Sequence, residues 1–305
     1  MSLAAQIRQV RQFNRLVTQR VGALDDHFLG RGRALGASRL LFEIGERGAD
    51  LRDLRRRLGL DAGYVSRLIK SLVHEGLIRI DSHPGDQRVR TARLTARGKR
   101  EIAELNARSD RLAAELLGAV SPKQRARLVA AMTEVHRLLR AAGLVIERVP
   151  PASPPARWCW AQYFAELDRR FPGGFDPGTT LAVDDRDFVP PHGVFLVGSI
   201  DGETVAGGSV KMTARGVGWL KRMWVAESAR GLGIGRRMLE ALEDAARGLG
   251  ATTIRLDTNR TLHEAIAMYR SAGYRPVKPF NNEPYATHWF EKRLRRKQPP
   301  RTQGV

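Results

Sequence analysis

The chain has 305 residues, of which 42% are hydrophobic and 28% charged, a balance typical of globular proteins with room for two cores. Its formal net charge is +20, and residues 1–140 contribute +13 of it, from 28 Lys and Arg against 15 Asp and Glu. This uneven charge makes the first half the expected partner of a nucleic acid.

The single cysteine, Cys159, excludes an internal disulfide and suits a reducing compartment, where an isolated buried thiol is its expected state. No apolar run approaches the ~20 residues that span a bilayer, and the N-terminal stretch lacks the long apolar segment of a secretory signal. We therefore expect a cytoplasmic protein with no membrane association.

Three helices are predicted in the first half of the chain, at residues 38–47, 51–58 and 62–75. The second and third follow Asp50 and Asp61, aspartates being preferred helix N-caps. One face of the third helix is apolar, and the opposite face carries Ser66, Arg67 and Lys70. A short helix, a tight turn and a second helix with a basic face are typical of a helix-turn-helix whose second helix enters the major groove.

Two strands should follow, at 77–80 and 88–95, joined by a turn at 81–87. A strand pair after a recognition helix is a wing. The predicted first domain is therefore rich in α-helix, with a two-stranded wing.

The wing sequence Asp86-x-Arg88, followed by Leu-Thr-x-x-Gly at 94–98, closely resembles the MarR family of winged-helix regulators. The resemblance runs from about residue 24 to about 140. It implies binding to double-stranded DNA, with Arg88 reaching towards the minor groove, Asp86 bracing it, and Arg90 contributing on the same strand. The alternative for Asp86 and Arg88 is an ion pair that merely closes the hairpin.

Further helices flank this module, in residues 3–28, at 99–120 and from Pro122 onwards. The last of them carries an apolar stripe formed by Leu128, Met132, Val135 and Leu139. MarR-like proteins dimerise through such helices, so the resemblance implies a homodimer and a palindromic DNA site with half-sites about one helical turn apart. In a monomer the same stripe would be ordinary core.

The last flanking helix ends at Ala-Ala-Gly, residues 141–143, and residues 144–148 predict the first strand of a second domain. The expected domains are 1–140 and 143–297, followed by a basic, proline-containing tail at 298–305 that should be disordered. So short a connector should limit the relative freedom of the two domains. Within the second domain we expect a helix at 156–170 and a hairpin at 193–213.

An apolar strand at 217–225 precedes a glycine-rich turn, Arg230-x-x-Gly233-x-Gly235, and then an amphipathic helix. Glycines at this spacing let successive N–H groups point into one concavity at a helix N-terminus, which suits a pyrophosphate. Arg236 stands where the third glycine of a dinucleotide fingerprint belongs, so that interpretation fails, and no Walker sequence occurs.

Three motifs together resemble the GNAT superfamily of acetyl-CoA-dependent N-acetyltransferases. They are Leu-Lys-Arg-Met-Trp-Val at 220–225, Arg-Gly-Leu-Gly-Ile-Gly at 230–235, and Asn-(x)5-Ala-(x)3-Tyr-(x)3-Gly-Tyr at 259–274. The resemblance implies an α/β (α+β) fold with a mixed, mostly antiparallel central sheet. It also implies acetyl-CoA as cosubstrate.

The same resemblance assigns roles to particular residues. The backbone of Met223, Trp224 and Val225 is expected to hold the pantetheine arm, and Asn259 to lie along the cofactor channel. The expected pyrophosphate loop consists of Arg230, Gly231, Gly233, Ile234 and Gly235.

Tyr269 is the expected catalytic residue, placed to protonate the departing thiolate. A phenol with a pKa near ~10 is protonated at neutral pH and is an adequate acid towards a thiolate. The alternative is that its ring only anchors the core.

The general base is harder to assign, because Trp219 stands where the family often has a glutamate. Glu227, Glu283 and His288 are candidates by sequence proximity alone, and each is expected to be a solvated surface residue. A chain of waters could also remove the proton. No cluster with metal-ligand spacing is evident, so no metal is expected.

The leading interpretation is a bifunctional protein, a DNA-binding transcriptional regulator that also transfers acetyl to a primary amine on a small molecule or peptide. Two alternatives remain open. The winged helix could serve only for dimerisation, or the GNAT-like domain could sense acyl-CoA without turnover, an alternative that Trp219 keeps open. The sequence does not identify the amine.

Overall fold

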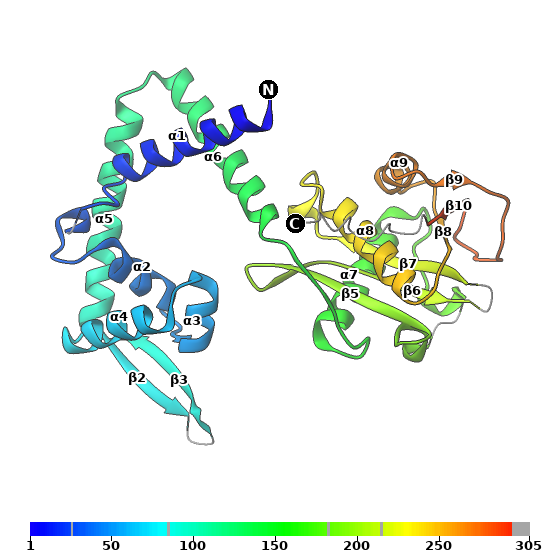
Figure 1. Cartoon of the computed structure of the whole chain (residues 1–305), viewed down its shortest axis with the longest axis horizontal. Helices are drawn as coiled ribbons and strands as arrows, with labels where there is room; N and C mark the ends of the chain where they lie inside the picture. Colours follow the sequence, from blue (N-terminus) through cyan, green and yellow to red (C-terminus); the bar gives the residue numbers. More distant parts are fainter. Residues whose placement is uncertain (26, 84–85, 182–183, 214–215, 295–305) are drawn as a thin grey trace, which may run out of the picture. The chain divides into compact units, whose positions relative to one another are not determined.

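The structure, a computed structural model, divides into two compact units, residues 1–129 and 130–305 (Figure 1). It describes residues 1–25, 27–83, 86–181, 184–213 and 216–294. The predicted disordered tail at 298–305 lies outside the described residues. So do the side chains of residues 82–89, which include Asp86 and Arg88 of the wing.

The first unit is mainly helical, as predicted. Its helices are α1 (Leu3–Arg20), α2 (Leu35–Ile44), α3 (Leu51–Leu58), α4 (Ala62–His74) and α5 (Ala96–Gly118). Its strands are β1 (Ala49–Asp50), β2 (Ile78–His83) and β3 (Asp86–Leu94), which form a sheet in the order β1-β3-β2. The next helix, α6 (Pro122–Ala142), runs through the division between the units.

Both predicted N-caps are confirmed. The Asp50 carboxylate accepts hydrogen bonds from the first backbone N–H groups of α3, and the Asp61 carboxylate accepts one from the N–H of Tyr64 in α4. The prediction for α2 was wrong by three residues at each end. This helix ends at Ile44 because the following residue, Gly45, has φ 58° and ψ −176° and so leaves the helical conformation.

The turn predicted at 81–87 is shorter than expected. Strands β2 and β3 stay paired through Asp81 opposite Thr91 and Ser82 opposite Arg90. Backbone pairing is indifferent to the polarity of exposed side chains, so the polar residues that suggested a turn continue the ladder instead. The sheet also gains a short third strand, because β1 pairs with β3.

A buried carboxylate ties the loop after α1 to α5. Glu101 is 7% exposed and accepts hydrogen bonds from Arg31 (Nε to Oε1, 2.8 Å) and from Arg33. Hydrogen bonding by Arg31 lowers the pKa of the Glu101 carboxyl from 4.5 to about 2, although burial opposes the change. The pair is therefore ionised throughout the physiological range.

The second unit contains a seven-stranded sheet in the order β4-β5-β6-β7-β8-β10-β9. Its strands are β4 (Val145–Arg148), β5 (Gly193–Ile200), β6 (Glu203–Met212), β7 (Val217–Val225), β8 (Thr253–Thr258), β9 (Arg275–Pro276) and β10 (His288–Arg293). Its helices are α7 (Pro154–Arg170), α8 (Ile234–Gly248) and α9 (His263–Ser271). Only β7 and β8 pair in parallel, so the predicted mixed, mostly antiparallel sheet is confirmed.

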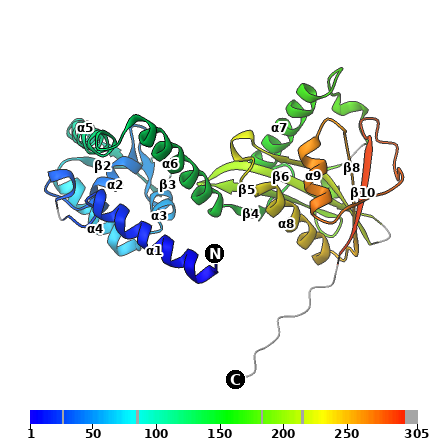
Figure 2. The ribbon, with the colours of Figure 1, turned by 90° about the horizontal axis from the view of Figure 1, so that it is seen from above.

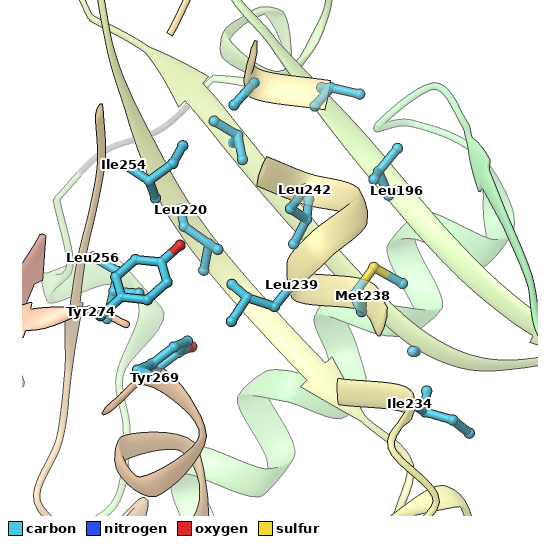
Figure 3. Packing of buried hydrophobic residues seen from close by; sticks show 14 of the residues in the cluster. Leu196, Leu220, Ile234, Met238, Leu239, Leu242, Ile254, Leu256, Tyr269 and Tyr274 are labelled. Carbon is cyan, nitrogen blue, oxygen red and sulfur yellow. The ribbon is translucent and has the colours of Figure 1, made fainter. Parts of the chain in front are cut away.

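Helices α8 and α7 cover opposite faces of this sheet (Figure 2). The apolar stripe of α8, with Met238, Leu239 and Leu242 fully buried, packs on side chains of β5, β7 and β8 (Figure 3). Across the sheet, α7 buries Cys159 as predicted, and an ideal Cβ on Gly207 of β6 would lie 2.7 Å from the Cys159 Cβ. Glycine at that position therefore sets how closely α7 approaches the sheet.

The sheet opens between β7 and β8. Their parallel pairing covers only residues 217–219 and 253–255, after which β8 continues in register with β10 as far as Thr258. On its other side, β7 shifts register against β6 between Gly207 and Ser209, and Arg222 takes a left-handed φ of 54° at this bulge. The last residues of β7 consequently offer backbone groups to an opening in the sheet.

Candidate functional site

A cavity of about 480 Å³ lies where the end of β7, the glycine-rich turn, α7 and α9 meet. We call it the glycine-loop cavity. Nearly all of the residues predicted to bind the cosubstrate line it: Met223, Trp224, Val225, Arg230, Gly231, Gly233, Ile234 and Gly235. The end of β7 and the glycine-rich turn that follows it thus line one cavity. Of the residues predicted to bind the cosubstrate, only Asn259 does not line it.

The glycine-rich turn presents a row of free backbone donors. Gly231 and Gly233 have φ of 76° and 75°, a conformation that strains other residues, and no side chain caps the start of α8. The N–H groups of residues 231–236 donate to no other described residue. Six unpaired donors at a helix N-terminus fit a diphosphate, because both the N–H groups and the helix dipole favour an anion.

Carboxylates and guanidinium groups alternate from Arg230 of the turn through α7 to α9. Glu166 binds Arg230 and forms an ion pair with Arg170 (3.1 Å), and Arg170 in turn binds Glu264 (2.9 Å). Hydrogen bonding by Arg170 lowers the pKa of the Glu264 carboxyl to about 2. No local sequence pattern indicates Glu166, Arg170 and Glu264, which lie on two helices far apart in the chain.

A second cavity, which we call the aromatic cavity, has a wall of aromatic rings contributed by Tyr163, Phe164, Phe171, Phe175 and Tyr285. Ring centroids lie 5.6 Å apart for Phe164 and Phe175, and 4.9 Å apart for Phe175 and Tyr285. Asn259 also lines it. Its amide donates to the Tyr285 carbonyl (2.7 Å), which fixes the end of β8 to the loop before β10.

The polar side of the aromatic cavity contains two carboxylates and a lysine. Asp257 accepts hydrogen bonds from Trp219 Nε1 (2.9 Å), Asn281 Nδ2 (3.1 Å) and Lys221 Nζ (3.3 Å). The Trp219 indole, in the place of the expected glutamate, therefore positions an aspartate on the neighbouring strand. All the donors that reach Asp257 do so through the same oxygen, Oδ1.

Glu283 was wrongly predicted to be a solvated surface residue. Its side chain is 9% exposed and lines the aromatic cavity, where Oε2 accepts from the Leu181 N–H (3.3 Å) and faces Lys221 Nζ (3.5 Å). The other oxygen, Oε1, is buried and has no hydrogen-bond partner. Of the other two base candidates, Glu227 is exposed, and neither Glu227 nor His288 lines this cavity.

Tyr269 lies where the two cavities meet, since it lines both of them together with Tyr163 and Met223. Its ring packs beside Tyr274 in the core (Figure 3) and is 6% exposed, yet its hydroxyl forms no hydrogen bond with any described residue. Burial, with a contribution from the charge of Asp257, raises the pKa of the Tyr269 phenol. The hydroxyl is therefore protonated at neutral pH and free to donate.

A basic surface lies on the first unit. The predicted Ser66, Arg67 and Lys70 are exposed on α4, and Arg90 is exposed on β3. Lys70 and Arg90 line a shallow groove between α3, α4 and β3, where they are joined by Arg52 and Arg55, which the sequence analysis did not single out. Arg88 belongs to β3, and its side chain lies outside the described residues.

Two helices carry exposed apolar side chains. On α1 no residue is buried, and Leu3, Ile7, Val10, Phe13, Leu16 and Val17 are exposed. In α6, Met132, Val135 and Leu139 of the predicted stripe are 49%, 37% and 68% exposed. These side chains therefore do not belong to the core of their own unit.

Across the described ranges, no group of three or more His, Cys, Asp or Glu side chains could hold a metal ion. No helix in that part of the chain is both long and apolar enough to span a membrane.

Comparison with known proteins identifies both regions. The model of the acetyltransferase (GNAT) family matches residues 160–274, and that of the MarR family matches residues 31–89. An "IAA acetyltransferase" of Azospirillum brasilense is 36% identical over 120 residues, which are 39% of this chain and 78% of the relative. The chain therefore belongs to the GNAT acetyltransferase family, and it combines this domain with a MarR-like DNA-binding domain.

Two further proteins are each similar to one part of the chain. An uncharacterized HTH-type transcriptional regulator of Bacillus subtilis, YdgJ, is 30% identical over 77 residues, which cover 25% of this chain and 47% of that regulator. Among solved structures, a GNAT-family acetyltransferase from Staphylococcus aureus is 15% identical, covers 50% of this chain and 99% of its own, and superposes with a TM-score of 0.40.

Proposed function

We propose that this protein is a bifunctional cytoplasmic regulator that binds DNA and transfers acetyl from acetyl-CoA to a primary amine. One observation carries the enzymatic part. The glycine-loop cavity, with six unpaired N–H groups, meets the aromatic cavity, with an unpaired buried carboxylate oxygen, at the free hydroxyl of Tyr269. An acyl donor and an acceptor would thus meet at a proton donor.

Acetyl-CoA fits the first cavity by its chemistry. The N–H groups of residues 231–236 would hold the diphosphate, and the backbone of residues 223–225, at the opening of the sheet, would pair with the pantetheine amides. The thioester supplies an activated acetyl group at the junction. In this arrangement Arg230 exchanges part of its pairing with Glu166 for the phosphates.

Two side chains transfer the protons of the reaction. Glu283 Oε1 accepts one proton from the incoming ammonium, which frees the nitrogen lone pair to bond to the thioester carbonyl carbon. As the carbon–sulfur bond breaks, the nitrogen loses its second proton to water and Tyr269 donates its proton to the sulfur. Glu283 then releases its proton to solvent, and Tyr269 regains one. The products are an N-acetyl amine and a free thiol, with one net proton released.

A screen of small amines, amino acids and basic peptides tests this proposal, with thiol release from acetyl-CoA as the readout. We expect turnover with at least one class of amine. Calorimetry with coenzyme A runs in parallel. Coenzyme A binding without turnover of any amine would support the sensor alternative, and no binding at all would contradict the assignment of the cavity.

The DNA-binding part of the proposal is a homodimer on a palindromic duplex. The contacts would come from Ser66, Arg67 and Lys70 on α4 and from Arg88 and Arg90 on the wing. Because phosphate contacts release counterions, affinity should fall steeply with salt. Replacing Arg67, Lys70 and Arg88 together by Gln should weaken binding at least about 100-fold in a fluorescence anisotropy titration. Undiminished affinity would rule out this recognition surface.

A further inference from the structure

Arg222 presents an unpaired guanidinium in the aromatic cavity. The residue sits at the bulge of β7 with φ 54°, a conformation that is strained for a non-glycine residue. Its guanidinium carbon lies 4.6 Å from the ring centroid of Trp160 and 5.0 Å from that of Phe164. Arg222 forms no hydrogen bond or ion pair with any described residue. The guanidinium is thus held between rings, with its N–H donors free.

The acids near Arg222 are already engaged. Asp185 binds Arg157, and Glu283 binds the Leu181 N–H and faces Lys221. Burial lowers the pKa of the Arg222 guanidinium, which nevertheless keeps its charge at neutral pH. Arg222 is only partly buried, so its free donors stay accessible to a ligand, and a planar carboxylate is the ligand whose two oxygens match its fork of donors.

A complementary acceptor lies in the same cavity. Glu283 Oε1 is buried and unpaired, and Glu283 and Arg222 line the same cavity. The cavity therefore offers a site for a carboxylate and a site for an ammonium. The wall formed by Phe164, Phe171, Phe175 and Tyr285 offers an apolar surface.

We propose that the acetyl acceptor is a free amino acid with an aromatic or large apolar side chain. Its carboxylate binds Arg222, its amino group faces Glu283, and its side chain packs on the rings of the cavity wall. This inference rests on the acetyl transfer proposed above. It disfavours peptide N-termini, in which the carboxylate has become an amide, and simple amines that lack one.

The test compares phenylalanine with phenylalaninamide and phenethylamine as acceptors, at saturating acetyl-CoA. Amidation removes the carboxylate and leaves the ring and the amino group in place. We expect kcat/KM for phenylalanine to exceed that of both analogues by about 100-fold or more. Equal rates for phenylalanine and its amide would overturn the proposal.

Variants of Arg222 test whether its guanidinium causes the preference for an acceptor with a carboxylate. Arg222→Gln should lower kcat/KM for phenylalanine about 100-fold while leaving the rate with phenylalaninamide within about twofold and coenzyme A affinity unchanged. Arg222→Lys, which keeps the charge but loses the planar fork, should fall between the two. Arg148→Gln, an exposed arginine on β4 outside both cavities, is the matched control and should behave as wild type. A preference that survives in Arg222→Gln would contradict the assignment.

Binding of the product separates this inference from the proposed catalysis. In the presence of coenzyme A, calorimetry should detect N-acetylphenylalanine but not N-acetylphenylalaninamide, and Arg222→Gln should abolish the difference. This result in a protein that turns over no amine would retain the carboxylate site and reject the enzymatic proposal. Binding of neither compound would reject the site. Thermal unfolding of each variant establishes that the lost response is not a loss of fold.

Discussion

At the scale of single residues, Tyr269 combines a buried ring with a free hydroxyl. The neighbouring Tyr274 has a similarly buried ring, but Tyr274 lines neither cavity. The two tyrosines therefore form a natural pair of test and control.

We predict that Tyr269→Phe lowers kcat for acetyl transfer by about 100-fold, because the leaving sulfur loses its proton donor, while coenzyme A binds as before. Tyr274→Phe should leave kcat unchanged. Since burial raises the pKa of Tyr269, its deprotonation should cause no alkaline loss of rate below pH ~10. A Tyr269→Phe protein with the wild-type rate would leave only the anchoring role.

Glu101 on α5 holds the loop after α1 by accepting hydrogen bonds from Arg31 and Arg33. Because its pKa is lowered from 4.5 to about 2, its contribution to stability is fully present above pH ~4.5 and is lost as the pH falls towards 2. We predict that Glu101→Gln reduces the stability of the first unit at pH 7 by about 2–3 kcal/mol and flattens its loss below pH 4.5. Urea unfolding measures both effects, and Glu115→Gln, exposed on the same helix, is the control. Equal stability of the two variants would contradict this role.

At the scale of elements, the close approach of Gly98 to the backbone of Leu77 determines where α5 begins. An ideal Cβ on Gly98 would lie 2.0 Å from the carbonyl oxygen of Leu77, which also accepts the N–H of Thr95. Any side chain at residue 98 must therefore push the start of α5 away from the base of the wing.

We predict that Gly98→Ala destabilises the first unit by more than about 2 kcal/mol. It should also weaken DNA binding, because Leu77, which the new Cβ would contact, directly precedes the first strand of the wing. The control is Gly118→Ala at the other end of α5, where a Cβ meets nothing within 4 Å. It should be neutral or stabilising by up to ~1 kcal/mol. Thermal unfolding and anisotropy titrations measure the two effects, and an unperturbed Gly98→Ala protein would disprove the clash.

At the scale of the whole molecule, the exposed apolar side chains of α1 and α6 favour an interface with a second copy of the chain. We predict that replacing Met132 and Val135 together by Glu converts a homodimer to a monomer, because four charges would enter an apolar interface. Sedimentation velocity measures the change. Affinity for a palindromic duplex should fall with it, whereas acetyl transfer should not. Arg127→Gln, exposed on the same helix, should remain dimeric, and a dimeric double variant would place the interface elsewhere.

Coupling between the two activities is a hypothesis at the same scale. Helix α6 runs from Pro122 to Ala142, and only Gly143 and Leu144 separate it from β4. We predict that saturating acetyl-CoA changes affinity for DNA by at least about fivefold, the lower range of allosteric coupling. Identical DNA affinities with and without acetyl-CoA would end the hypothesis.

The sequence by itself determined most of the elements and the glycine-rich turn, because caps, periodicity and backbone conformation are local properties. Helix α3 has the predicted bounds, and the residues of the turn meet in one cavity. Only the tertiary structure revealed the roles of Arg222 and Glu283. They come from a strand bulge and a distant loop, and nothing in the local pattern indicates that the Arg222 guanidinium and Glu283 Oε1 are left unpaired. Whether a charged side chain is solvated or remains available to bind a ligand depends on which neighbours the fold places around it.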